Sequence, residues 1–174
     1  MKKLDKIFIS IIVILALACK NPNPNLDTLG QDELEALEVD KTPDESSLSY
    51  NNEFYVPIYS DIYIDSQNPK HLLSATLSIR NTNSKDSLFV SKINYYDTHG
   101  LLVKKFIDKP ISLPPMATVN YVIEKEDDTG GSGANFIVHV SSRSPMIRPL
   151  IQAIMIGQYS NKSFSFSTDG YPLE

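Results

Sequence analysis

The sequence contains no tryptophan and a single cysteine, Cys19. A lone cysteine excludes an intrachain disulfide, so the folded part must be stabilised by its core. The basic residues form no stripe along the chain, which argues against a nucleic-acid-binding protein. No long stretch repeats its apolar residues with the helical period, which argues against a helical bundle.

The chain begins with features that are typical of an export signal. Three lysines within the first six residues precede an apolar run over residues 7–18, which only Ser10 interrupts. A membrane-spanning helix needs roughly 20 apolar residues, so this run is too short to cross a bilayer. We therefore expect residues 1–18 to be a signal peptide.

The residues before Cys19 are small and apolar, in the sequence "LALAC". This stretch resembles the lipobox of bacterial lipoproteins, although Ala16 stands where leucine is commoner. The resemblance implies that Cys19 is the lipidation site, acylated (palmitate included), and becomes the mature N-terminus. Several acyl chains on one residue anchor a protein firmly to a membrane without spanning it. Lys20 replaces the aspartate that retains lipoproteins in the inner membrane, so the expected location is the cell envelope, with the outer membrane favoured. The alternative is an ordinary thiol in an uncleaved signal anchor.

An acidic segment follows the cysteine. Residues 20–53 contain nine acidic residues and two lysines, whereas residues 54–170 contain eleven basic and ten acidic residues. Cleavage before Cys19 changes the formal charge from −5 to −7 by leaving 13 basic and 20 acidic residues. High net charge with few apolar residues is typical of disorder. We predict an acidic flexible tether over residues 19–53 and a folded domain over residues 54–174.

The folded part consists of short apolar runs separated by turn residues. About eight runs rich in Val, Ile, Tyr, Phe and Thr follow one another, and the clearest alternates over residues 72–80. A period of two with one apolar face is typical of a strand that is buried on one side. We predict an all-β fold, an immunoglobulin-like antiparallel β-sandwich of about eight strands.

Several phrases in this domain resemble a known bacterial family. "YVPIYSDIY" (55–63), "YYDTHGLLVKKF" (95–106) and "GGSGANFIV" (130–138) are similar to members of domain-of-unknown-function family 3124, and the resemblance covers about residues 54–170. It implies exported or membrane-anchored bacterial proteins and carries no activity with it. Val140 replaces a residue that is usually aromatic, and Gln152 one that is usually acidic.

The glycine-rich loop "EDDTGGSGANF" is the strongest candidate for a ligand motif. It lacks the lysine of a phosphate loop, and Phe136 replaces the third glycine of the dinucleotide fingerprint, so we expect no nucleotide. Its oxygen donors suit calcium, but consecutive acids do not match the EF-hand spacing. We favour a tight turn whose glycines supply positive φ, or a contact loop for a partner. The candidate residues of this binding or structural loop are Asp127, Asp128, Gly130, Gly131, Gly133 and Asn135.

Catalytic and metal motifs are weak in this chain. His71, His99 and His139 lack the spacing of metal ligands on one element. No G-x-S-x-G sequence marks a nucleophile. A Ser–His–Asp triad is an open alternative at this point, because the members of a triad come together only in space and leave no local sequence pattern. We expect no cofactor, no catalytic residue and no metal site.

Nine tyrosines give the final indication of function. Aromatic rings suit a protein or glycan partner, although they also serve to cover a core. We expect a membrane-anchored lipoprotein that works as a non-catalytic binding module, with another envelope protein as partner. The alternative is an envelope hydrolase or a metal-dependent enzyme. The candidate aromatic patch comprises Tyr55, Tyr59, Tyr63, Tyr95 and Tyr96.

Overall fold

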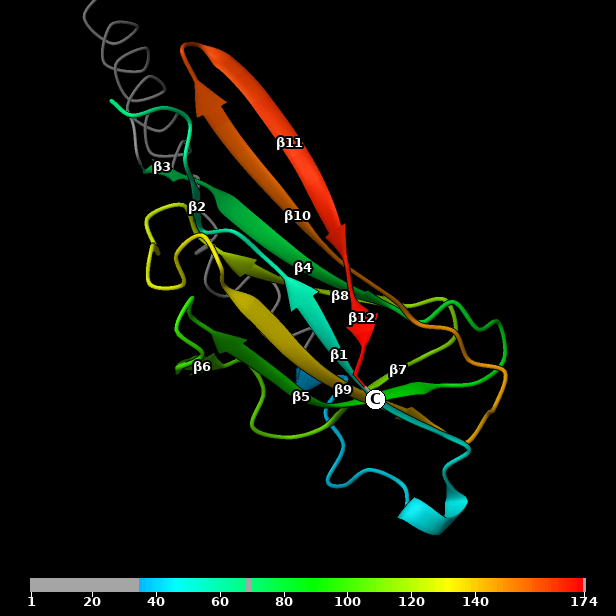
Figure 1. The fold of residues 1–174 in the computed structure, drawn as a ribbon. Helices are drawn as coiled ribbons and strands as arrows, with labels where there is room; N and C mark the ends of the chain where they lie inside the picture. Colours follow the sequence, from blue (N-terminus) through cyan, green and yellow to red (C-terminus); the bar gives the residue numbers. More distant parts are fainter. Residues whose placement is uncertain (1–34, 68–69, 174) are drawn as a thin grey trace, which may run out of the picture. The chain divides into compact units, whose positions relative to one another are not determined.

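The computed structural model describes residues 35–67 and 70–173 (Figure 1). The predicted signal peptide and Cys19 therefore lie outside the described residues. The chain from Ala36 onward forms one compact unit. In the described part of the chain, no helix is both long enough and apolar enough to cross a membrane.

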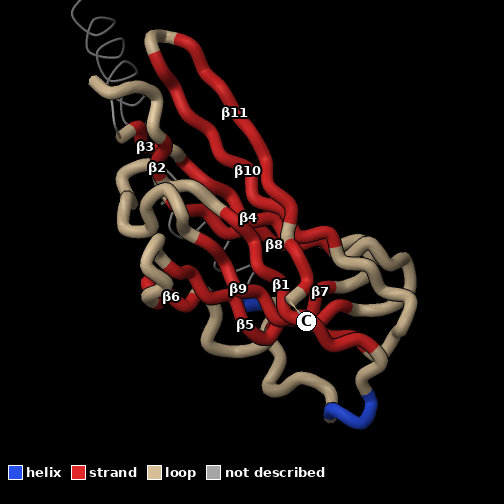
Figure 2. Tube along the Cα trace, viewed as in Figure 1, coloured by secondary structure: helices blue, strands red, loops and turns tan. Residues whose placement is uncertain are grey.

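Two antiparallel sheets form this unit (Figures 1 and 2). The larger sheet has the order β12 (Tyr171–Pro172), β1 (Tyr50–Pro57), β9 (Asn135–Ser142), β5 (Leu88–Tyr96) and β6 (Leu102–Lys105), and β7 (Ile111–Leu113) also pairs with β5. The smaller sheet has the order β11 (Lys162–Asp169), β10 (Leu150–Tyr159), β4 (Ser74–Arg80) and β8 (Thr118–Ile123). A short hairpin of β2 (Asp61–Ile62) and β3 (His71–Leu72), and a 3-10 turn at Glu45–Ser47, complete the described elements.

The predicted all-β antiparallel sandwich is confirmed. Of the twelve strands in the described residues, eight have four or more residues, which agrees with the predicted number. The alternation over residues 72–80 places its apolar residues in the core, where Leu73, Ala75, Leu77 and Ile79 are fully buried. On the facing sheet Phe136 and Val138 are also fully buried, so the two inner faces form one core.

A β-bulge interrupts the alternation of β5. Val90 pairs with Val140 and Lys92 pairs with His139, so Ser91 is the extra residue between them. A bulge of this kind changes which residues face the core. As a result Val90 and Ile93 are both fully buried, and Ser91 approaches His139 on the outer face.

Part of the predicted tether is bonded to the sandwich. Leu37 accepts a hydrogen bond from the amide of Ser112 at 2.8 Å, and the amide of Val39 donates to Pro110 at 2.9 Å. Glu38 forms an ion pair with Lys109 at 3.0 Å. Strand β1 begins at Tyr50, which also lies within the predicted tether.

The hairpin between β5 and β6 follows the turn chemistry of its sequence. The Asp97 carboxylate accepts hydrogen bonds from the amides of His99 and Leu101, both at 2.8 Å. Gly100 has a φ of +79°, which a residue with a side chain rarely adopts. This turn brings β6 back beside β5 at one edge of the larger sheet.

Candidate functional site

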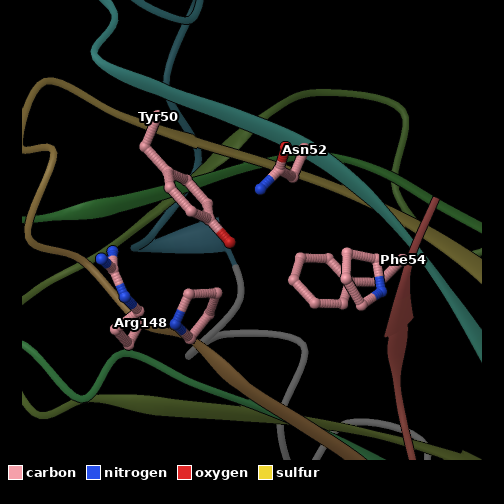
Figure 3. Close-up of a pocket in the computed structure, with 6 residues that line it drawn as sticks. Tyr50, Asn52, Phe54 and Arg148 are labelled. Atoms are coloured by element: carbon pink, nitrogen blue, oxygen red, sulfur yellow. The ribbon is translucent and has the colours of Figure 1, made fainter. Parts of the chain in front are cut away.

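An open cleft of about 480 Å³ lies beside the first half of β1 (Figure 3). Tyr50, Asn52 and Phe54 line it from the same side of the strand as the buried Val56, because alternate residues of a strand share a face. Figure 3 shows Tyr50, Asn52, Phe54 and Arg148 around a shared space. The remaining lining residues are Pro149 and Pro172.

Backbone pairing holds the wall of the cleft in place. Phe54 pairs with Pro172 of β12, and the amide of Leu173 donates to the carbonyl of Glu53 at 2.7 Å. On the other side of β1, Tyr50 pairs with Ser142. Strands β1 and β12 therefore present the rings of Tyr50, Phe54 and Pro172, whereas Pro149 precedes β10.

Arg148 supplies the positive charge of the cleft. Its Nη1 donates to the carbonyl of Pro145 at 3.0 Å and to that of Ile147 at 2.6 Å. Its own carbonyl accepts a hydrogen bond from the hydroxyl of Thr82. Among residues 35–67 and 70–173, no carboxylate lies within ion-pair distance of Arg148. The guanidinium is thus positioned by the backbone and keeps donors for an anion.

A second polar group lies on the outer face of the larger sheet, at its centre. The hydroxyl of Ser91 lies 2.5 Å from Nδ1 of His139. Lys92 and Glu53, on the strands flanking β9, form an ion pair. Burial lowers the pKa of His139; the charge of Glu53 opposes this shift, and that of Lys92 adds to it.

In this group the structure brings a serine (Ser91), a histidine (His139) and a carboxylate (Glu53) close together. In a catalytic triad the carboxylate orients the imidazole through a hydrogen bond. Here the Glu53 carboxylate bonds to Lys92 instead. The cluster therefore has the residue types of a triad without the bond that orients the base.

The glycine loop is shaped by close packing against β5 and the turn that follows it. A Cβ on Gly130 would lie 1.8 Å from the hydroxyl oxygen of Tyr95, and one on Gly131 would lie 2.6 Å from the Thr98 hydroxyl. Gly131 has a φ of +73°. The Thr98 hydroxyl also accepts a hydrogen bond from the amide of Gly133 at 2.9 Å. Packing and positive φ account for these glycines.

The acids of this loop are bonded within the protein. Asp127 accepts hydrogen bonds from the amide of Thr129 at 3.2 Å and from its hydroxyl at 2.5 Å. Asp128 forms an ion pair with Lys70 at 2.7 Å, and Asn135 is the first residue of β9. The part of the chain that the structure describes contains no cluster of three metal-ligating side chains.

The predicted aromatic patch is wrong for Tyr95. This residue is fully buried and its ring lies 5.2 Å from that of Phe136, centroid to centroid. The shift in alternation at the bulge in β5 directs Tyr95 into the core. Tyr96, the next residue, consequently lies on the outer face.

The remaining tyrosines of the prediction do not form one surface. Strand β1 ends at Pro57, so Tyr59 and Tyr63 lie beyond it and do not continue its face. The Tyr59 ring contacts that of Phe166 edge-on, with centroids 5.8 Å apart, whereas Tyr63 is 73% exposed. Tyr55 lies on the outer face with Tyr96, but β9 separates their strands.

Sequence reasoning missed the cleft because its residues are far apart in the chain. Tyr50 and Asn52 fell within the predicted tether, and Arg148 carries no local motif. The sequence did contain a signal for the start of β1. Every second residue from Tyr50 to Val56 lies on the same side of a strand, so the period of two begins at Tyr50 and not at Phe54. Nothing local indicates that Arg148 lies opposite these residues.

Comparison with known proteins gave a matching family model and a similar solved structure. The model of a family described as "Protein of unknown function (DUF3124)" matches residues 51–173. No curated protein matches this chain. A crystal structure of Thermotoga maritima 1070 is similar with 15% identity and a TM-score of 0.38, covering 69% of this chain and 92% of that one.

Proposed function

The chain belongs to the family described as "Protein of unknown function (DUF3124)", and from this premise we propose that it is a bacterial envelope lipoprotein that works by binding another envelope protein. Its anchor is the lipidated Cys19, which lies outside the described residues, and the outer membrane is the favoured location. The sandwich domain binds its partner without catalysis.

One observation carries the binding function: Arg148 is held by two backbone carbonyls, has no carboxylate partner in the described chain, and borders a cleft with aromatic and prolyl walls. An arginine forms its strongest hydrogen bonds with a carboxylate or a phosphate. The ring of Tyr50 adds apolar contact area, as aromatic residues do at protein interfaces. An extended segment of a partner protein with an acidic side chain suits both features: its carboxylate can bind the Arg148 guanidinium, and its apolar atoms can contact the aromatic wall.

The amide of Asn52 completes this chemistry. An amide group donates and accepts hydrogen bonds, so it suits the backbone of an extended peptide. Phe54 is only 8% exposed, so its ring forms a floor that a ligand need not rearrange. A preformed site of this kind loses little entropy when it binds.

A photo-crosslinking experiment tests the proposed function. Tyr50 is replaced by a benzophenone amino acid in the full chain, envelopes are irradiated, and the crosslinked peptide is identified by mass spectrometry. We expect one protein to be crosslinked through a segment that contains Asp or Glu. The Arg148→Gln change should weaken the binding of that purified partner about tenfold, the loss of one charge-assisted hydrogen bond.

Arg80→Gln is the matched control, because Arg80 is an exposed arginine at the end of β4 that does not line the cleft. This control should bind the partner as the unmodified chain does. Equal binding by the Arg148→Gln and Arg80→Gln forms would contradict the proposal. The anchor is tested separately: Cys19→Ala should release the protein from the membrane fraction.

A further inference from the structure

Strand β11 forms one edge of the smaller sheet. It pairs with β10 and with no other strand in the described part of the chain. Figure 1 shows β11, in red, at the outer margin of the sheet, in a long hairpin with β10. A strand at such an edge has one row of backbone groups without a partner in the sheet.

The register of the hairpin identifies these groups. Tyr159 and Lys162 close a two-residue turn, and the pairing continues without a shift to Asp169. The amide of Gly170 donates to the carbonyl of Ile151 at 2.8 Å, which fixes the even-numbered residues as those bonded to β10. Hydrogen-bonding direction alternates along an antiparallel strand. Odd-numbered residues therefore direct their N–H and C=O groups outward; these are Ser163, Ser165 and Ser167.

This edge lacks the devices that protect the edges of the larger sheet. Residues 163–168 contain no proline, glycine or charged side chain, and the pairing with β10 contains no bulge. The edges of the larger sheet differ, since β6 carries Lys104 and Lys105 and β12 carries Pro172. Lysine, proline and bulges are the features that prevent edge-to-edge pairing.

The edge is also complementary to itself. In an antiparallel pair of β11 strands related by a two-fold axis at Ser165, Ser165 faces its own copy and Ser163 faces Ser167. These are the outward-bonding residues, so the hydrogen bonds of the two edges match. Phe164 then faces Phe166 of the other copy at a pair without hydrogen bonds, where side chains approach most closely.

Charge selects the same arrangement. Lys162 and Asp169 stand at opposite ends of β11. Antiparallel pairing brings the basic end of one strand to the acidic end of the other, whereas parallel pairing brings like charges together. A two-fold axis also produces a closed dimer, and no further copy can add to the used edge.

We propose that two copies of this chain associate through β11, joining their four-stranded sheets into one continuous sheet. This inference is independent of the cleft, because none of the cleft-lining residues belongs to β11. The partner is a second copy, and the contact is an antiparallel strand pair centred on Ser165.

Cysteine crosslinking tests the register. The full chain in detergent, with Cys19→Ala to remove its only native thiol, receives one cysteine at a time. A hydrogen-bonded antiparallel pair has a Cα–Cα distance of about 5.5 Å, within the range for a disulfide. Ser165→Cys should form a disulfide-linked dimer on oxidation. Ser167→Cys should not, since its two copies would lie about 14 Å apart, whereas a mixture of Ser163→Cys and Ser167→Cys should.

Sedimentation of the full chain in detergent tests the association itself. We expect the unmodified chain to be a dimer and both the Ser165→Lys and the Ser165→Pro forms to be monomers. The lysine would place two positive charges next to each other at the two-fold axis. The proline would remove the outward N–H of residue 165. The fold should tolerate both, since neither removes a bond to β10. Asn120→Lys, on β8 at the other edge of the sheet, is the matched control and should leave the dimer intact.

Three results would overturn the inference. The first is a chain without substitutions in β11 that sediments as a monomer at every concentration. The second is a Ser165→Lys form that stays dimeric with an unchanged circular dichroism spectrum. The third is crosslinking of Ser167→Cys alone as readily as of Ser165→Cys, which would indicate random collision.

Discussion

The hydroxyl of Tyr95 fills the space that a side chain on Gly130 would need, because a Cβ built there would lie 1.8 Å from the Tyr95 oxygen. The carbonyl of Gly130 is meanwhile bonded to both the amide and the hydroxyl of Thr98, each at 2.9 Å. The glycine loop and the end of β5 are thus packed as one unit. Its glycines serve the fold in this region.

The Gly130→Ala change should therefore destabilise the domain by about 3 kcal/mol, the upper range for inserting a methyl group into a packed site. Urea unfolding followed by circular dichroism measures this free energy. Gly100→Ala is the control, because its φ is +79° but nothing lies within 4 Å of its Cβ position. It should cost only about 1 kcal/mol, from backbone strain. Equal costs for the two variants would contradict the packing argument.

Tyr95 should also make stability fall at alkaline pH. Burial raises the pKa of Tyr95 from 10.0 to about 12. The unfolded chain loses the Tyr95 proton at a lower pH than the folded chain does. The contribution of Tyr95 to stability is therefore complete below a pH of about 10. As the pH rises toward 12 it is lost, by about 1.4 kcal/mol of unfolding free energy per pH unit. Tyr95→Phe should reduce this slope, measured as the urea midpoint between pH 9 and 12.

Tyr55→Phe is the control for the alkaline experiment, because Tyr55 lies on the outer face. It should unfold with the slope of the unmodified protein. Burial also raises the pKa of Tyr121, so the Tyr95→Phe form should keep part of the slope. An unchanged slope in that form would contradict the prediction.

Asn81 should be among the most sensitive polar positions. It is 2% exposed, and its amide nitrogen donates to the carbonyls of Asp86 at 2.8 Å, Leu113 at 3.0 Å and Pro114 at 2.9 Å. Asn81→Ala leaves these carbonyls without their donor and should cost about 3 kcal/mol. Thermal unfolding compares it with Asn83→Ala, a less buried asparagine in the same loop whose Oδ1 accepts hydrogen bonds from the amides of Lys85 and Asp86. Because these bonds are exposed to solvent, only about 1 kcal/mol is expected for that change.

His139 should make the domain sensitive to mild acid. Burial lowers its pKa in the folded state, whereas the unfolded chain takes up a proton near the ordinary value of about 6.5. Its contribution to stability is therefore complete above about pH 6.5 and is lost as the pH falls below that value. His139→Gln should flatten the stability profile between pH 5 and 7.5.

His99→Gln is the control for the acid experiment, because His99 is exposed in the turn between β5 and β6. Its profile should match that of the unmodified domain. If the His139→Gln form loses as much stability on acidification as the unmodified chain, another group titrates there.

The core strands and the β5–β6 turn were predictable because their information is local. Leu73, Ala75, Leu77 and Ile79 alternate in the sequence, and burial follows from that alternation. Asp97 and Gly100 specify their turn through a side-chain hydrogen bond and a positive φ. Tyr95 could not be assigned correctly in the same way, because the bulge at Ser91 shifts the alternation and depends on pairing with β9.

The sequence by itself determined a two-sheet β fold, since the alternation of apolar residues is a property of neighbouring residues. Tertiary structure alone brought Arg148 to Tyr50 across about a hundred residues of sequence, placed Ser91 beside His139, and left β11 at an edge. Strand order decides these three arrangements. It is set by the pairing of segments distant in the chain, for which no local pattern exists.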